Sequence, residues 1–410
     1  MIADKVAIIG AGMTRFHYSL HLGKSTRELF VEAFLECLES VDKGINHKDI
    51  EALFIGNTVN EYFEHQSHLS SLLADWSGLL PIPSTRIETA CASSSTALEI
   101  GTLAVASGMY DIVLVGGVEK MSTLQTDEMT WALMSGMDQA YECPLGVSNP
   151  GLYAMMAMAH FEKYGSTWEQ LATISIKNHH NASLNPKAQY QSEIIDTANK
   201  IAQKKGLSFK DEMDFLQSPS NPYVAYPLRL FDCSPISDGA STVILASTEK
   251  AKNFTDTPIY ISGLGHKSGT MSLHDRNDFT TIPSAVEAGK KAYKMAKIEP
   301  KDIDVAMVHD CFTPAEMIAI EDLGFFTKGE GARASEEGRT SLTGEIPINT
   351  DGGLKAKGHP IAATGTAMVH EVWKQLRGEA EKRQVPNANI GLLHNIGATG
   401  GTAVVQIFKR

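Results

Sequence analysis

The sequence predicts an α/β protein that contains two copies of one strand–helix unit. Apolar runs of strand length alternate with amphipathic helical patterns along most of the chain. The run VAIIGAG near the start returns as IYISGLG at residues 259–265, and similar elements follow both runs in the same order. In each series a turn rich in small residues opens a helix, RIETACASSSTALEI in the first and NTDGGLKAKGHPIAATG in the second. A duplicated unit of this kind is expected to place its equivalent helix N-termini together at a pseudo-twofold axis.

The first series begins with a strand at residues 6–10 and a helix at 25–38, whose apolar residues recur at helical spacing after a Ser/Thr start. A second strand is predicted at 50–55. In the stretch 86–100, a short extended run breaks at a single cysteine before the next helix. Residues 110–117 (YDIVLVGG) form a continuous apolar strand of the kind that is buried on both faces in α/β proteins.

Between residues 119 and 235 the character of the sequence changes, which indicates an inserted region. Its segments are rich in methionine and aromatic residues, and the adjacent histidines His179 and His180 are expected to be solvated. One helix is dense in methionine, which favours an adaptable packing surface, although the same surface would suit a pantetheine arm. These methionines are Met155, Met156 and Met158. Residues 234–247 then return to small residues and a strand.

The second series repeats the order of the first. A strand at 259–265 is followed by a helix at 282–295 and by the strand VAMVHDCF at 305–312. A glycine-rich turn then enters a helix within residues 349–373, as the cysteine turn does in the first series. The last strand region, at 389–408, is the counterpart of YDIVLVGG. This correspondence predicts that Cys91 and His359 lie together.

Length and composition exclude several classes of protein. The chain has 410 residues, 43% of them hydrophobic, and no apolar run reaches the roughly 18 residues that cross a bilayer. Its formal charge of −12 argues against a nucleic-acid partner. The five cysteines are an odd number without a CxxC pair, which favours free thiols in the cytoplasm over disulfides or a zinc site. They are Cys37, Cys91, Cys143, Cys233 and Cys311.

Cys91 has the sequence context of a nucleophile. It stands where a strand ends and a run of alanine, serine and threonine opens a helix, so that free amides and the positive end of the helix dipole face the sulfur. Such a position is expected to depress the pKa of the thiol and to favour the reactive thiolate. A buried structural cysteine is the alternative interpretation.

Three further clusters lie at predicted strand ends or tight turns, where active sites of α/β proteins are built. They are centred on His309 (HDCF), His359 (GHP) and His394 (HNIG). Taken singly, each histidine is explained as readily by core packing. Taken together with Cys91, they favour one shared site.

These motifs resemble those of the thiolases, most closely the sterol-carrier-protein type and its archaeal and bacterial relatives. The resemblance covers nearly the whole chain and rests on CASSS, HDCF, KGHPIAATG, QLRGEAEKRQVP and HNIGATGG. It implies two βαβαβαββ halves in five layers (α-β-α-β-α) with an inserted loop domain. The predicted boundaries are 1–118 with 236–255 for the first half, 119–235 for the loop domain and 256–410 for the second half.

The resemblance implies roles for the first set of site residues. Cys91 would be the nucleophile that becomes acylated, and His359 the base that activates it. Attack of a thiolate on a thioester builds an oxyanion, so that backbone amides must be aimed at it. The amides of Cys91 and of Gly397, in the GATGG turn region, are the expected donors.

The sequence departs from better-known thiolases at a second set of residues. His309 stands where those enzymes carry an asparagine that helps to bind the thioester oxygen, and Asn395 stands where they carry a second, acid/base cysteine. Another group must therefore move the proton. Cys311 is the expected acid/base residue with His309 as oxyanion donor, and the reverse assignment is the alternative.

The expected activity is that of an acetyl-CoA C-acetyltransferase, which condenses two acetyl-CoA molecules or cleaves a 3-oxoacyl-CoA. Coenzyme A is then a substrate, and no cofactor or metal is expected. The alternatives are a thiolase for longer chains, a retro-aldol lyase acting on a steroid or acyl-CoA side chain, and a non-catalytic thiolase-like subunit. The resemblance also implies a homodimer or homotetramer, and association with a small OB-fold protein and HMG-CoA synthase in the mevalonate route.

Overall fold

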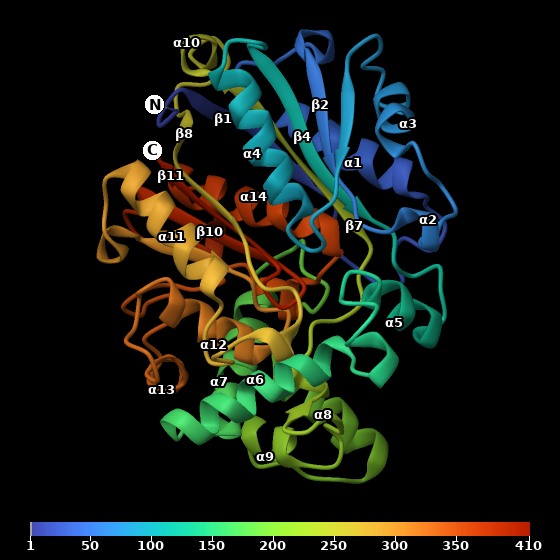
Figure 1. Cartoon of the computed structure of the whole chain (residues 1–410), viewed down its shortest axis with the longest axis vertical. Coiled ribbons are helices and arrows are strands. Elements are labelled where there is room, and N and C mark those ends of the chain that lie inside the picture. The colour runs from blue at the N-terminus through green and yellow to red at the C-terminus, as the bar shows by residue number, and fades with distance from the viewer. Residues whose placement is uncertain (1) are drawn as a thin grey trace.

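The computed structural model describes residues 2–410 and is built on a nine-stranded mixed sheet with the strand order β3-β2-β4-β7-β1-β8-β11-β10-β9 (Figure 1). The strands are β1 (Val6–Met13), β2 (Ala52–Gly56), β3 (Ser84–Ile87), β4 (Ile112–Glu119), β7 (Gly239–Ser247), β8 (Ile259–Ser268), β9 (Val305–Val308), β10 (Ile390–Gly397) and β11 (Thr402–Lys409). A separate hairpin pairs β5 (Tyr223–Ala225) with β6 (Leu228–Arg229). Met1 lies outside the described residues.

Fourteen helices surround the sheet within the described chain. In the first half these are α1 (Thr26–Glu39), α2 (Asn60–Phe63), α3 (Leu69–Trp76), α4 (Ser93–Ala106) and α10 (Thr248–Ala251). Between β4 and β7 lie α5 (Thr126–Met134), α6 (Asn149–Tyr164), α7 (Trp168–Ser183), α8 (Ile194–Lys205) and α9 (Glu212–Gln217). The second half has α11 (Pro283–Ala296), α12 (Thr313–Asp322), α13 (Gly331–Glu336) and α14 (Thr364–Arg377).

The strand order confirms the duplication. Read toward the centre of the sheet, the strands β2-β4-β7-β1 of the first half correspond to β9-β10-β11-β8 of the second half. The first half has β3 outside β2, and the second has only a parallel bridge between Ala306 and Ile348 at the equivalent place. The halves join where β1 pairs with β8 through Ala7–Tyr260 and Ile8–Ile259. This short seam makes one continuous sheet from two related ones.

Helices α4 and α14, the equivalent helices of the two halves, pack together at the centre of the molecule (Figure 1). Their entrances approach so closely that side chains are excluded. A Cβ atom at Gly365 would lie 2.5 Å from the amide nitrogen of Ser95, and on the adjacent strand β4 one at Gly117 would lie 2.2 Å from the carbonyl oxygen of Ala362. The small residues of both turns therefore allow backbone to pack on backbone, which positions the two entrances around one site.

The helices and the hairpin between β4 and β7 form the lower part of the molecule in Figure 1. Of the α6 methionines, Met156 is buried, whereas Met155 and Met158 are largely exposed. His180 is exposed, as expected, but His179 is buried, and the prediction that it is solvated was wrong. The His179 ring stacks on Tyr190 at a centroid distance of 5.1 Å, a contact that its own sequence neighbourhood does not show.

All five cysteines are free. Within residues 2–410, none of the helices combines the length and the apolar character that crossing a bilayer requires.

Candidate active site

Cys91 lies in the turn between β3 and α4. The turn is held by hydroxyl groups, because Ser93 Oγ donates to the carbonyl of Ala90 (2.6 Å) and accepts from the amide of Thr89 (3.0 Å). Ala90 has a φ of 51°, the left-handed region that a non-glycine residue adopts only at a cost of roughly 1–2 kcal/mol. The turn thus directs Cys91 from the end of a strand into the space between the two halves.

His359 lies in the equivalent turn before α14. Gly358 has a φ of 117°, and a Cβ atom there would lie 2.7 Å from the hydroxyl of Ser237, so the position requires glycine. The same hydroxyl accepts the backbone N–H of His359 at 3.0 Å. The ring is fixed by Thr364, whose Oγ1 lies 2.7 Å from Nδ1 of His359. Burial lowers the pKa of His359 well below 6.5, and electrostatic interaction with the neighbouring His309 and Lys357 acts in the same direction, so the ring is neutral near pH 7.

His309 follows β9 and is completely buried. Its Nδ1 lies 2.8 Å from Oδ1 of Asn395, and its Nε2 has no hydrogen-bond partner. Burial lowers the pKa of His309 to about 4, an effect that the Asn395 contact only partly offsets. His309 is therefore also neutral near pH 7.

The fold brings Cys91 and His359 together, as the duplication predicts, and adds His309 to form one cluster. Each contributes one sulfur or ring nitrogen atom, and these three atoms lie within 4.8 Å of one another. The two imidazole rings meet edge to face, with centroids 5.4 Å apart. His394 is not part of this cluster. Both of its ring nitrogens are buried without a hydrogen-bond partner.

The pKa of Cys91 differs from the sequence-based prediction. Burial raises the pKa of its thiol to about 12, and the negative charge of Glu119 adds to this. The backbone amides of Ala398 and of Cys91 itself act in the opposite direction, but they do not outweigh the loss of solvent around a thiolate. The expected depressed pKa was therefore wrong. The resting group is a thiol, so that its reaction requires a base beside it.

Cys311 lies close to the cluster, on the wall of the same cavity. Burial raises the pKa of the Cys311 thiol well above 9, and the neighbouring Cys91 raises it further. The hydroxyl of Tyr153 is a hydrogen-bonding neighbour of Cys311, and it donates its hydrogen to the carbonyl of Ala398 at 2.9 Å. Cys311 is therefore a neutral thiol as well.

The GATGG turn supplies a backbone amide to the site. The amide that contacts the Cys91 sulfur is that of Ala398, one residue after the expected Gly397. Gly397 is needed for close approach, since a Cβ atom there would lie 2.5 Å from the carbonyl oxygen of Thr89. Ala398 has a φ of 52°, which turns its backbone sharply after β10.

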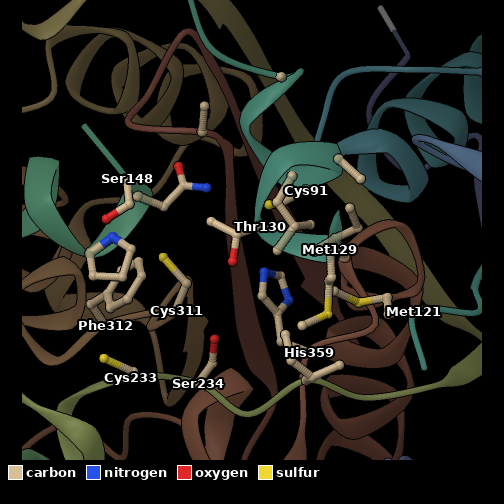
Figure 2. A pocket seen from close by; sticks show the side chains of 18 of the residues that line it. Cys91, Met121, Met129, Thr130, Ser148, Cys233, Ser234, Cys311, Phe312 and His359 are labelled. Carbon is tan, nitrogen blue, oxygen red and sulfur yellow. The ribbon is translucent and has the colours of Figure 1, made fainter. Parts of the chain in front are cut away.

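The cluster opens into a cavity of about 430 Å³ (Figure 2). Figure 2 shows Cys91, His359 and Cys311 around one space, with Met121 and Met129 beside His359. The lining is mainly apolar and comes from both halves and from the inserted region. Apolar members of the wall include Met121, Met129, Leu133, Ile236, Phe312 and Ile361. None of the three α6 methionines lines it, so the suggested pantetheine surface is not the cavity wall.

Sequence reasoning missed two contributors to this site. It treated Asn395 as the loss of a cysteine, yet the Asn395 amide nitrogen donates to the Cys91 carbonyl and to Ser95 Oγ, both at 3.0 Å. It also missed Tyr153, which lies in the inserted region far from the motifs. The polar residue of HNIG was a visible signal for Asn395, but nothing in the sequence distinguishes Tyr153.

A duplicated α/β fold with a thiol and a neutral imidazole at paired helix entrances, and a second neutral imidazole close to both, is the arrangement of the thiolase class of enzyme. The thiolase N-terminal domain matches residues 6–249, and the thiolase C-terminal domain-like family matches residues 265–410. The chain belongs to the thiolase family.

Similar proteins refine this assignment. Acetyl-CoA acetyltransferase of Methanothermobacter thermautotrophicus is 49% identical over 405 residues, which cover 99% of each chain. Sterol carrier protein 2 of Bos taurus is 31% identical over 424 residues, covering 100% of this chain and 73% of that protein. The solved Ltp2-ChsH2(DUF35) aldolase shares the fold, with a TM-score of 0.81 at 23% identity, covering 99% of this chain and 98% of that one.

Proposed function

We propose that this protein is an acetyl-CoA C-acetyltransferase that condenses two acetyl-CoA molecules, or cleaves acetoacetyl-CoA, through an acetyl-Cys91 intermediate. The observation that carries the proposal is the cluster of Cys91, His309 and His359, whose sulfur and nitrogen atoms lie within 4.8 Å of one another beside an apolar cavity. The archaeal relative that is 49% identical over its whole length is an acetyl-CoA acetyltransferase by name, which supports the acetyl group as substrate.

His359 is proposed as the base that takes the proton of Cys91. The Thr364 hydroxyl donates to the carbonyl of Pro360 (3.1 Å), so its oxygen accepts the Nδ1 hydrogen of His359. In the neutral ring this leaves a lone pair on Nε2. Since the thiol of Cys91 is protonated at rest, proton transfer to this lone pair generates the nucleophile as the thioester arrives.

The remaining groups complete the reaction. Attack on the thioester carbonyl creates an oxyanion, for which the backbone amides of Cys91 and of the turn at Gly397 and Ala398 are the proposed donors. In the second half-reaction, a base removes a proton from the α-carbon of the second acetyl group, and Cys311 and His309 are the candidates. Coenzyme A serves as substrate and product, and this chemistry needs no further cofactor.

Two measurements test the proposal. Incubation with acetoacetyl-CoA and CoA should consume the substrate, followed at the thioester absorbance. Mass spectrometry after incubation with acetyl-CoA should locate one acetyl group on Cys91, and Cys91→Ala should carry none. An acetyl group on Cys37, Cys143 or Cys233, or one that survives in Cys91→Ala, would contradict the assignment.

The apolar cavity favours a second candidate, thiolysis of longer 3-oxoacyl-CoA substrates. A volume of about 430 Å³ with a mainly apolar wall exceeds what an acetyl group needs, although part of it must hold the pantetheine arm. Comparison of kcat/KM for 3-oxoacyl-CoA substrates of increasing chain length decides between the two. A maximum at acetoacetyl-CoA supports the acetyltransferase, and a maximum at a longer chain supports the second candidate.

We further propose a homodimer that forms along β3. Pairing of two such dimers into a tetramer would use additional surfaces. This strand is the short, unpaired edge of the nine-stranded sheet, and such edges are usually covered. Exposed apolar side chains lie on neighbouring segments, namely Tyr62, Trp76 and Leu80. A stable and active monomer in sedimentation experiments would contradict this.

The cellular context is also a proposal. The five free thiols suit a reducing compartment such as the cytoplasm. A small OB-fold partner and transfer of acetoacetyl-CoA to HMG-CoA synthase in the mevalonate route follow from the family resemblance. One solved neighbour of the same fold carries a DUF35 component in its name, which supports a search for partners by co-purification.

A further inference from the structure

The GATGG turn between β10 and β11 contains a strained backbone. The amide of Gly400 donates to the carbonyl of Gly397 at 3.0 Å and closes the turn, and Ala398 follows Gly397 with a φ of 52°. A non-glycine residue adopts this left-handed region at a cost of roughly 1–2 kcal/mol. Such a conformation persists only where the surrounding structure fixes it. Contacts from outside the turn must therefore hold Ala398 in place.

Four successive carbonyl groups of the turn, at residues 398–401, each accept a hydrogen bond from another segment. The donors are, in order, the Tyr153 hydroxyl (2.9 Å), the Arg276 guanidinium (2.7 Å), the Ser284 hydroxyl (2.7 Å) and the Gly269 amide (2.9 Å). They belong to α6 of the inserted region, to α11 and to the segment between β8 and α11. Three separate segments thus hold one short turn.

Tyr153 holds the peptide group that follows Ala398. The peptide group before it joins the Ala398 amide to the Gly397 carbonyl, and the closing bond of the turn holds that carbonyl. Both peptide groups that flank the Ala398 Cα are therefore fixed. Tyr153 is only 1% exposed, and its ring packs against Phe312 at a centroid distance of 4.8 Å. Its hydroxyl consequently has little freedom to move.

Arg276 holds the next peptide group along the turn. Its guanidinium donates to the carbonyl of Thr399 and to the hydroxyl of the same residue (3.0 Å), and also to the carbonyl of Thr270 (3.0 Å). The planar fork of an arginine lets one side chain hold two segments, and its charge makes these bonds stronger than neutral ones. Arg276 is buried but is not part of the cavity wall. It can act on the site only through the turn.

The Ala398 amide is the group that these contacts direct into the site. It contacts the Cys91 sulfur in the resting protein, and Ala398 and Tyr153 both line the cavity. We propose that Tyr153 and Arg276 are positioning residues that aim the Ala398 amide at the oxyanion formed during acetyl transfer to Cys91. This inference rests on the proposed function, and it assigns no proton transfer to either residue. A preorganised donor of this kind needs no rearrangement when the charge develops.

The first test is Tyr153→Phe, which removes the hydroxyl and keeps the ring. Single-turnover acetylation of Cys91, followed by mass spectrometry, should slow by about tenfold or more, since complete loss of an oxyanion donor costs about 100- to 1000-fold. Tyr293→Phe is the matched control, because that buried hydroxyl donates to the carbonyl of Leu323 at 3.0 Å and lies outside the cavity wall. The control should acetylate at the wild-type rate.

Alkylation of Cys91 by iodoacetamide separates the oxyanion from the nucleophile. The sulfur displaces iodide from a carbon atom, so that no oxyanion forms, whereas the thiol and His359 are needed as before. Alkylation, located on Cys91 by mass spectrometry, should slow by less than about threefold in Tyr153→Phe, because the amide matters most where the oxyanion develops. Equal losses in alkylation and acetylation would show a general disturbance of the site and would overturn the proposal.

Infrared spectroscopy reads the hydrogen bond directly. Acetyl-CoA labelled with ¹³C at its carbonyl gives a labelled acetyl-Cys91, and a hydrogen bond to this carbonyl lowers its stretching frequency. The band should therefore lie at higher wavenumber in Tyr153→Phe than in the wild-type protein. An unmoved band would overturn the proposal, because the amide would then be aimed without help from Tyr153.

Variants of Arg276 test the second contact. Arg276→Lys retains the charge and loses the fork, whereas Arg276→Gln loses both, so acetylation should fall further in Arg276→Gln. In Tyr153→Phe with Arg276→Lys, the loss should be smaller than the product of the two single losses, because both residues act on one amide. A loss equal to that product would show independent roles and would overturn the proposal. If an Arg276 variant fails to fold, the infrared band of Tyr153→Phe decides.

Failure of this inference differs from failure of the proposed function. Wild-type rates of acetylation in Tyr153→Phe would overturn the positioning role and leave the proposed function intact. A wild-type protein that never acetylates Cys91 would overturn the proposed function, and the positioning role with it.

Discussion

The two helix entrances that meet at the active site are held by different chemistry. The nucleophile entrance, residues 87–96, is held in its interior by neutral hydroxyl groups, because Ser93 closes the turn and the hydroxyls of Thr89 and Thr96 lie 2.8 Å apart. A carboxylate contact there, from Glu88 to the amide of Ala90, is exposed to solvent. The base entrance, residues 349–364, is held by buried charges. Lys357 and Asp351 form an ion pair, with both side chains no more than 2% exposed.

The difference follows from the path of the chain. The nucleophile entrance continues directly from β3, whereas the base entrance passes through a π-helical turn at Gly353–Lys357. A residue of another segment holds that turn: the carboxylate of Asp310, in the loop after β9, accepts a hydrogen bond from the amide of Leu354 at 2.6 Å. A Cβ atom at Gly353 would lie 2.1 Å from the same carboxylate.

The charges also suit the chemistry of each entrance. Positive charge on Lys357 lowers the pKa of His359 and helps to keep that base neutral. At the nucleophile entrance the neighbouring Glu119 raises the pKa of Cys91. Pseudo-symmetry therefore places the two helices alike, while burial, reinforced by these local charges, leaves a protonated thiol at one entrance and a neutral imidazole with a free lone pair at the other.

The largest effect is expected on removing the cation of the base entrance. Lys357→Met leaves Asp351 buried without its partner, which should lower the free energy of unfolding by about 3–5 kcal/mol. Urea unfolding measures this. The double variant Lys357→Met with Asp351→Asn should recover more than half of the loss, since no charge remains unpaired. A loss below about 1 kcal/mol in the single variant would show that charge does not hold this entrance.

The next effect is catalytic. His359→Ala should slow Cys91 acetylation by about 100-fold or more, because a protonated thiol loses its positioned base. Single-turnover mass spectrometry measures the rate, and the exposed His180→Ala serves as the matched control. An unchanged acetylation rate would mean that His359 is not the base that deprotonates Cys91.

Much of this arrangement could be predicted from the sequence. The duplicated order of elements placed Cys91 beside His359, and the strand predicted at 110–117 is β4 with a shift of two residues. The protonation states could not be predicted, because they depend on burial by segments from both halves and from the inserted region. The burial of His179 depends likewise on Tyr190 and Phe231, whose positions only the folded chain defines.

The loss of folding stability at acid pH should arise mainly from buried histidines in the second half of the chain. Burial lowers the pKa of His309 to about 4 and that of His394 to about 3, against 6.5 in the unfolded chain. Between these values the unfolded state binds more protons, so stability falls as the pH drops from 6.5 toward 4, by about 1.4 kcal/mol per pH unit for each group.

The contribution of one such histidine can be measured separately at His394, because both of its ring nitrogens lack partners and it lies outside the catalytic cluster. His394→Leu should reduce the fall in stability between pH 6.5 and pH 5 by about 2 kcal/mol. Urea unfolding at the two pH values measures this, and the exposed His180→Gln is the control. An unchanged pH dependence would indicate that His394 is protonated in the folded state.

The smallest effect is expected at the nucleophile entrance. Thr96→Val keeps the shape of the side chain and removes its hydrogen bond with Thr89. Net contributions of neutral hydrogen bonds are about 1 kcal/mol, so the free energy of unfolding should fall by about that amount. Thr102→Val, which removes a hydroxyl bond to the Leu98 carbonyl within α4, is the matched control. If Thr96→Val costs as much as Lys357→Met, measured by urea unfolding under the same conditions, then the hydroxyl contacts hold their entrance as strongly as the buried charges hold theirs.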